Sequence, residues 1–255
     1  MQDISPTQLS AKVALALLCV VRSGGWLSPT TVGVLDGDHP RFAPFPVEFY
    51  NSIPLAVITN QLAAPSPDSP PEGFINDTAG SLTWRLEGVH WQLLMRNPSN
   101  FVHELELLIA SRAWPLDWTE ELRKFWHELA IAECIEFAVV IALKRELPIP
   151  CDLGLTQLLK NLLVDYSVSQ IFELLQAAIE DTADFVARGY ITPKRAENFI
   201  VGACQRRADR ARADGSTIEG LQRDPMLGRT QASYLLHDVF LGHGEDGFFQ
   251  VIPRA

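Results

Sequence analysis

Residues 117–147 read DWTEELRKFWHELAIAECIEFAVVIALKREL, and this stretch decides the fold class. Asp117 and Glu120 form the D-x-x-E pattern of a capping box, in which side chains bond to the free N–H groups of a first helical turn. No glycine or proline interrupts the apolar residues that follow until Pro148. Because the residue before a proline disfavours helical backbone, a helix usually ends there. The sequence therefore predicts one long helix from about residue 117 to 147.

The flanking segments on the C-terminal side continue the helical pattern. Ser167 or Ser169 can cap one helix, and Gly189 and Gly215 are suited to the left-handed backbone that often ends helices. The predicted helices span residues 101–113, 156–164, about 168–187, 192–215 and 230–241. Residues 99–255 are therefore expected to form a helical bundle of about six helices.

The N-terminal part has a different composition. Twelve of the 17 prolines lie at or before Pro115, which predicts an irregular, turn-rich chain. A helix is expected from Ser5 to about Val21, because Ser-Pro is a common helix start. Residues 47–62 fit either a strand or a helix, and residues 63–73 (AAPSPDSPPEG) predict an exposed proline-rich loop.

Two β-prone runs close this N-terminal part. Residues 82–86 and 89–95 are rich in Trp, Thr, Leu and Val, and Glu87-Gly88 separates them. A two-residue loop ending in glycine predicts a β-hairpin with positive φ at Gly88. We therefore expect an α+β chain that is mostly helical, with an irregular part over residues 1–98 and the helical bundle over residues 99–255.

Bulk composition favours a globular protein of the cytoplasm. The formal net charge is −10, and Cys19, Cys134, Cys151 and Cys204 include no C-x-x-C pair, so we expect reduced cysteines and no zinc site. The apolar run 13–21 is short of the ~20 residues that span a bilayer. It also lacks the flanks of a secretory signal, so a buried helix is expected there and no membrane contact.

One segment of this acidic chain is basic. Residues 188–229 contain nine Arg/Lys and five Asp/Glu. On a helix over 192–215, Arg195, Arg206 and Arg210 fall in one narrow sector with Arg207 beside them. These four arginines are our candidate partner-binding residues, because guanidinium groups suit carboxylates and phosphates. The alternative is a solvated face whose charge is paired locally, with Asp209 and Asp214 near the arginines.

A helix-turn-helix is a second hypothesis, for residues 156–176. Ser169 and Gln170 would lie at the start of the second helix, where DNA-binding versions contact base edges. That helix has no basic residue before Arg188, which opposes docking on phosphates. We favour two ordinary core helices here.

A hydrolase or nuclease is a third hypothesis, built from scattered acidic and histidine residues. Glu133 and Glu136 share one side of the long helix near His127 and Glu128, but a dimetal bundle needs ligand pairs from other helices as well. We expect them at the rim of a buried stripe or paired with Lys124 and Lys144. The remaining candidates are the loop residues 36–39 (DGDH), His237-Asp238 and residues 243–246 (HGED).

No phosphate-binding loop, dinucleotide fingerprint or nucleophile elbow occurs in the sequence. We therefore expect no cofactor, metal site or catalytic residue. The preferred hypothesis is a non-enzymatic subunit, adaptor or regulator of a larger assembly. It would bind a protein partner, or alternatively a nucleic acid, through the arginine-rich helix.

Overall fold

The computed structural model describes residues 4–35, 40–76, 82–148 and 153–254, and they form two compact units. Unit 1 comprises residues up to Phe125 together with 228–244, and unit 2 comprises residues 126–227 together with the chain from Glu245 onward. The chain therefore passes from unit 1 to unit 2 after Phe125, returns to unit 1 at Gly228, and enters unit 2 again at Glu245. The sequence had suggested a single division near residue 98. The later helices of the sequence are shared between both units.

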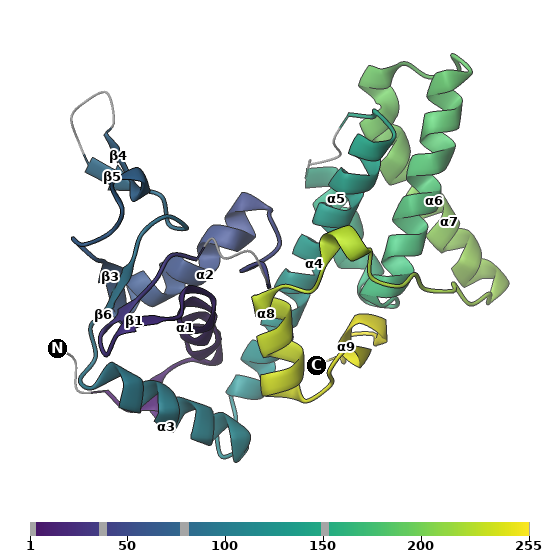
Figure 1. Ribbon diagram of the computed structural model, residues 1–255. Coiled ribbons are helices and arrows are strands. Elements are labelled where there is room, and N and C mark those ends of the chain that lie inside the picture. The colour runs from purple at the N-terminus through teal and green to yellow at the C-terminus, as the bar shows by residue number, and fades with distance from the viewer. Residues whose placement is uncertain (1–3, 36–39, 77–81, 149–152, 255) are drawn as a thin grey trace. The chain divides into compact units, whose positions relative to one another are not determined.

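The first long helix of unit 1 is α1 (Ala11–Gly24), and its side chains from Val13 to Val21 are all buried. Ser5 and Pro6 do not open it. They begin a separate 3-10 turn, in which the Gln8 side-chain oxygen accepts from the Ser5 backbone N–H. Ser10 caps α1, because its side chain accepts from the Val13 backbone N–H. The apolar run is thus a buried helix, as expected. It packs against α2 (Val47–Thr59), which decides that segment as helix in spite of Pro54 (Figure 1).

Short antiparallel strands complete the N-terminal part of unit 1. The larger sheet has the order β1-β2-β6-β3, and β4 pairs with β5 in a separate ribbon. The strands are β1 (Trp26–Ser28), β2 (Thr31–Val32), β3 (Ala63–Pro65), β4 (Phe74–Asn76), β5 (Leu82–Trp84) and β6 (Trp91–Leu93).

The predicted hairpin over residues 82–95 is wrong. β5 pairs with β4, Phe74 opposite Trp84, whereas β6 pairs with β2 and β3. Gly88 does not have a positive φ. It lies instead against Gly73, where a Cβ atom would stand 2.4 Å from the Gly88 carbonyl oxygen. Glycine is needed here because two backbones approach closely. The Glu87-Gly88 pattern in the sequence does not distinguish this role from that of a tight turn.

Helices close unit 1. α3 (Pro98–Ala110) contacts the 3-10 turn (Pro6–Gln8), and α8 (Gln231–Tyr234) contacts α1. α8 continues as a π-helix (Leu235–Leu241) that contacts both α1 and α3. The predicted helix over residues 230–241 is therefore present, but its second half has π-helical hydrogen bonding.

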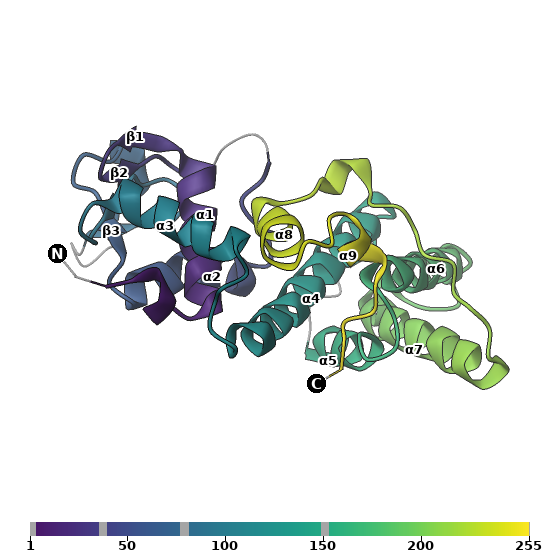
Figure 2. The ribbon, with the colours of Figure 1, turned by 90° about the horizontal axis from the view of Figure 1, so that it is seen from below.

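Unit 2 is helical in its described residues. α4 (Trp118–Lys144) is the predicted long helix, and from Trp126 onward it belongs to this unit. α6 and α7 pack side by side, and α5 contacts α7 (Figure 2). The other bounds are α5 (Leu153–Leu162), α6 (Val168–Ala187), α7 (Ala196–Asp214), α9 (Asp246–Phe249) and the 3-10 turns Pro193–Arg195 and Pro225–Leu227. Phe137 of α4 stacks on Phe172 of α6 at 3.9 Å between ring centroids.

The expected fold class is confirmed: the chain is mostly helical α+β, with a small antiparallel sheet near the N-terminus and a helical C-terminal part. The caps predicted for unit 2 are present as well. Ser167 accepts from the Gln170 amide, and Gly189 and Gly215 adopt left-handed backbone with φ of 75° and 62°. Among the described residues, no helix is both long and apolar enough to cross a bilayer.

Candidate partner-binding surface on α6 and α7

The four candidate arginines all lie on the surface of unit 2. Arg206, Arg207 and Arg210 come from the middle of α7, whereas Arg195 lies in the 3-10 turn that precedes it. All four side chains are exposed. Their role in binding a partner stays a prediction.

Three of these arginines gather around a hollow between α6 and α7. Its volume is about 250 Å³. The hollow is lined by Asp181, Phe185, Phe199, Ala203, Arg206, Arg207 and Arg210, and we call it the α6–α7 hollow. Arg195 is not among its lining residues. Arg207 and Arg210 also line a second hollow of about 210 Å³ that contains Glu173 and Asp214.

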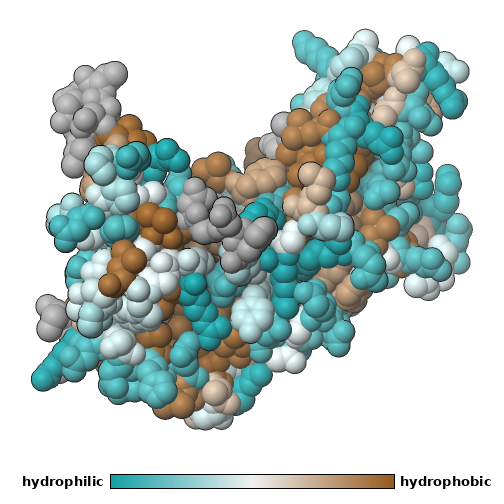
Figure 3. Space-filling view, viewed as in Figure 1, coloured by the Kyte–Doolittle hydropathy of each residue, from teal (hydrophilic) through white to brown (hydrophobic). Residues whose placement is uncertain are grey.

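Apolar side chains form one side of the α6–α7 hollow. The rings of Phe185 and Phe199 lie 5.2 Å apart at an interplanar angle of 51°, and Tyr190 lies 5.7 Å from Phe185. Phe185 is 39% exposed and Tyr190 is 68% exposed. The space-filling view shows hydrophobic residues among hydrophilic ones at the tip of the α6–α7 hairpin (Figure 3). The hollow therefore joins an exposed aromatic surface to a group of guanidinium ions.

The position of Arg206 is set by its neighbours on α7. Its guanidinium carbon lies 5.5 Å from the centre of the Phe199 ring, within cation–π range. The guanidinium also crosses Gly202, where a Cβ atom would stand only 3.1 Å from Nη1. The absence of a side chain at Gly202 thus leaves room for Arg206 to lie across the helix toward the aromatic ring.

The charges of the three arginines are compensated unequally. Arg207 pairs with Asp181 of α6 at 2.6 Å, a pair that is nearly half exposed on both sides. In the part of the chain that the structure describes, no carboxylate pairs with Arg206 or Arg210. Asp209, which we expected beside Arg206, accepts instead from Arg212 and Gln205. Two of the three guanidinium groups are therefore available to a partner.

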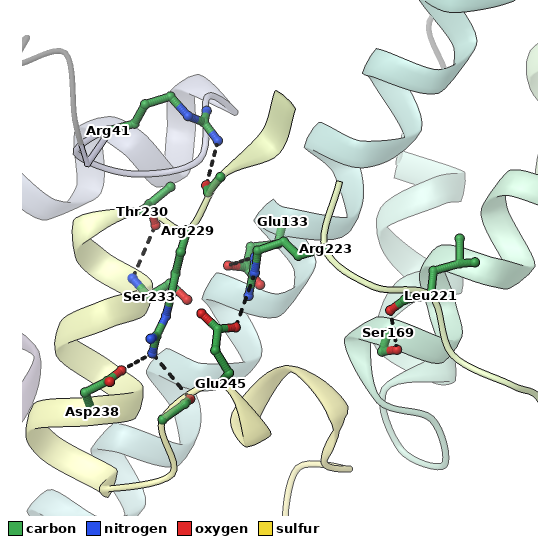
Figure 4. Close-up of polar contacts among 12 residues, drawn as sticks. Arg41, Glu133, Ser169, Leu221, Arg223, Arg229, Thr230, Ser233, Asp238 and Glu245 are labelled. Atoms are coloured by element: carbon green, nitrogen blue, oxygen red, sulfur yellow. Dashed lines mark hydrogen bonds and ion pairs between the residues drawn. The ribbon is translucent and has the colours of Figure 1, made fainter. Parts of the chain in front are cut away.

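The start of α6 is covered by the segment 216–221, which bears on the helix-turn-helix hypothesis. Ser169 is buried, and its hydroxyl donates to the Leu221 carbonyl at 2.7 Å (Figure 4). The side-chain amide Nε2 of Gln170 donates to the Ile218 carbonyl at 3.0 Å. Both side chains that the helix-turn-helix hypothesis assigned to base contacts thus donate hydrogen bonds to backbone carbonyls of the same chain. The close fit requires Gly220, where a Cβ atom would stand 2.0 Å from the Ser169 hydroxyl.

Glu133 and Glu136 are more buried than we expected, at 5% and 3% exposure. The predicted pairing with lysines is wrong. Lys124 pairs with Glu120 at 3.8 Å, and Lys144 pairs with Asp224 at 2.9 Å. Burial opposes the charge of Asp224, but hydrogen bonds from Lys144 and from the Met226 amide outweigh it, so the pKa of Asp224 is lowered.

The partner of Glu133 is Arg223, at 3.0 Å, and it arrives from 90 residues along the chain. The Arg223 guanidinium lies 4.3 Å from the centre of the Phe248 ring and 3.9 Å from the Glu245 carboxylate (Figure 4). Arg223 therefore fastens the chain between α7 and α8 to α4 and to the C-terminal turn within unit 2. One of the nine basic residues of the 188–229 segment thus serves the core.

The scattered acid and histidine candidates do not assemble into a ligand cluster where they are described. His237 is buried, and Asp238 pairs with Arg229. His243 donates its backbone N–H to the His237 carbonyl at 2.6 Å. Residues 36–39 lie outside the described residues. Within the described ranges, no group of three or more His, Cys, Asp or Glu side chains could hold a metal ion.

The described cysteines are free and buried, as expected for core residues. Burial raises the pKa of Cys204 to about 12, and it raises the pKa of Cys19 and Cys134 as well. These thiols are therefore poor nucleophiles. Cys151 lies outside the described residues. Among the tryptophans, Trp91 and Trp118 are core residues, whereas Trp26 and Trp84 are more than 40% exposed.

Sequence reasoning missed the apolar half of the α6–α7 hollow. On α7, Ala203 precedes Arg206 and Arg207 by three and four residues, and Phe199 precedes them by seven and eight. These helical spacings place the four side chains on one face. That signal was present. On α6, Asp181 and Phe185 are also four apart, but only the packing of α6 on α7 brings them to the arginines.

No protein-family description, curated protein or solved structure matches this chain.

Proposed function

We propose that this chain is a non-enzymatic binding protein of the cytoplasm, a subunit, adaptor or regulator that contacts an anionic protein partner through the exposed arginines of α7. The observation that carries this proposal is the unequal use of the arginines. Arg207 has a carboxylate partner in its own unit, whereas Arg206 and Arg210 project beside it with no carboxylate paired to them among the described residues.

The chemistry of arginine supports an anionic partner. A guanidinium group offers five N–H donors in a planar fork that fits a carboxylate or a phosphate. Arginine and aromatic residues are also enriched in protein interfaces, and the α6–α7 hollow contains both. Because the remainder of the chain is acidic, an anionic partner would be attracted to this surface and repelled elsewhere, which favours one orientation of binding.

The proposal predicts a selective effect of charge reversal at Arg206 and Arg210. The double variant Arg206→Glu, Arg210→Glu should fold normally, because exposed substitutions change stability by only about 0.5 kcal/mol each. Loss of a hydrogen bond to a charged group costs about 1.5–3 kcal/mol, so affinity for an anionic partner should fall about tenfold or more for each arginine.

The experiment compares three tagged proteins purified from the native host with and without nuclease treatment. These are the parent, the double variant and a control of equal charge change, Lys160→Glu with Arg254→Glu, whose positions are exposed and do not line the hollow. Binding of each protein to a fluorescent oligoglutamate peptide is measured in parallel at several salt concentrations. Equal partner recovery and equal peptide binding by all three would contradict the proposal.

A further inference from the structure

The α6–α7 hollow has a more specific chemistry than a positive surface. We propose that it takes a short acidic segment of a partner protein, and that this segment inserts one bulky apolar side chain against Phe185 and Phe199. This inference rests on the proposed function, since it names the class of partner for the same arginines.

The two halves of the hollow match the two halves of such a segment. Phe185, Phe199 and Ala203 offer an apolar wall, and the arginines stand at its edge. An apolar side chain against this wall would remove the partly exposed Phe185 ring from water. Carboxylates on the neighbouring residues of the same segment would then meet Arg206 and Arg210. This arrangement of a buried anchor within a charged rim is typical of the strongest contacts in protein interfaces.

The size of the hollow favours a single side chain. Pockets for drug-sized ligands and cofactors have volumes of about 300–1,000 Å³ and enclose most of the ligand. The α6–α7 hollow measures about 250 Å³ and lies open on the surface between two helices. It is suited to an anchor residue of a longer chain that continues beyond it.

The cationic half of the site is ordered before binding. Arg206 already lies across Gly202 and over the Phe199 ring, so one of its orientations is favoured in the free protein. Asp181 holds Arg207 by an ion pair at 2.6 Å. Side chains that are ordered in advance lose less conformational freedom on binding, which raises affinity for the group they fit.

The surroundings of the hollow favour a protein segment over a nucleic acid. Nucleic acids bind along grooves that offer many basic residues, because affinity depends on the number of phosphates neutralised. This hollow offers two arginines without a carboxylate partner among the described residues, and Asp181 and the 75% exposed Asp184 lie on the adjoining helix. A chain of net charge −10 would also repel the remainder of a long polyanion.

The test measures fluorescence anisotropy with three probes of defined composition. One is a peptide of glutamates around a central phenylalanine, the second has alanine in place of that phenylalanine, and the third is a single-stranded oligothymidylate. The parent protein should bind the phenylalanine peptide about tenfold more tightly than the alanine peptide, as expected for an anchor residue. It should bind the oligothymidylate more weakly than either peptide.

Two variants locate the preference in the hollow. Phe199→Ala, at a half-buried phenylalanine, should remove the discrimination between the two peptides. The control Phe249→Ala, at an exposed phenylalanine of unit 2 that does not line the hollow, should retain it. Gly202→Ala keeps a folded helix, because alanine is the better helix former, but its methyl group would stand 3.1 Å from Nη1 of Arg206 and shift the guanidinium from its place over the Phe199 ring. The Gly202→Ala variant should bind both peptides more weakly and by the same factor, while its melting temperature stays the same or rises.

The outcomes separate this inference from the proposed function. If both peptides bind with equal affinity and Arg206→Glu with Arg210→Glu weakens both, the inference of an inserted apolar side chain is wrong. The proposal of an anionic partner would still hold. If oligothymidylate binds more tightly than the phenylalanine peptide, the partner is a nucleic acid and the inference of a protein segment is wrong. If no probe responds to the charge reversal, both proposals fail.

Discussion

Replacing Arg223 by methionine should be among the most destabilising single changes in unit 2. Arg223 is 15% exposed and its partner Glu133 is 5% exposed, so the substitution leaves a carboxylate in the core without the guanidinium that faces it at 3.0 Å. Removing one member of a buried ion pair costs about 3–5 kcal/mol. Most of this loss arises from the isolated charge of Glu133, since methionine keeps much of the contact with the Phe248 ring.

The same reasoning predicts recovery in the double variant Arg223→Met, Glu133→Leu. Replacing both members by apolar residues of similar volume is often neutral or stabilising. The assay is urea unfolding at pH 7 followed by far-ultraviolet circular dichroism. The single variant should lower the midpoint by about 1 M or more, given slopes of about 1–3 kcal/mol per M.

The control is Arg145→Met, which breaks a pair with Glu180 at the same 3.0 Å but with both side chains more than 40% exposed. Exposed pairs contribute about 0–1 kcal/mol, so its midpoint should hardly move. If Arg223→Met behaves like this control, Glu133 is not an isolated buried charge. If the double variant is as unstable as the single one, the pair itself is not the cause of the loss.

Two further predictions concern the segment between α7 and α8. Gly220→Ala would place a methyl group 2.0 Å from the Ser169 hydroxyl. The Leu221 backbone N–H, which donates to the Ser169 carbonyl, should therefore exchange its hydrogen faster. Unchanged protection of this amide would show that the segment can shift. Because the folded-state pKa of Asp224 is lowered, its contribution to stability is present above its unfolded pKa of about 3.9 and is lost as the pH falls below it. The variant Asp224→Asn should therefore have a lower melting temperature than the parent at pH 7 and approach the parent at about pH 2, and curves that stay parallel over this range would contradict the assignment.

The helices of unit 2 could be predicted because their signals are local. The capping pair Ser167 and Gln170 lies three residues apart, and Gly189 and Gly215 end their helices through their own backbone conformation. Each signal acts within one turn of the chain, so a single sequence contains it completely. The same holds for the long helix α4, for which we expected residues 117–147 and the structure has Trp118–Lys144.

The sheet could not be predicted in the same way. β6 is flanked by β2, about 60 residues earlier in sequence, and by β3, about 30 residues earlier, whereas the predicted hairpin joined it to its neighbour in sequence. Strands that short expose few side chains for a periodic pattern, and their pairing is decided by the packing of the whole unit. Gly88 was assigned to a turn because a sequence does not show that another glycine lies against it.

The charge of the basic segment shows the same distinction between local and distant information. Nine basic residues in 188–229 suggested a surface for an anionic partner, yet Arg207, Arg212 and Arg223 pair with carboxylates 26, 47 and 90 residues away. Pairing of this kind depends on the fold, so a count of charges overestimates what a surface offers. The two arginines that remain at the hollow are few for a polyanion, where each neutralised phosphate adds about 0.9 to the salt dependence of binding to duplex DNA. They are sufficient for a protein segment that owes its affinity to one apolar anchor and uses charge to set its direction.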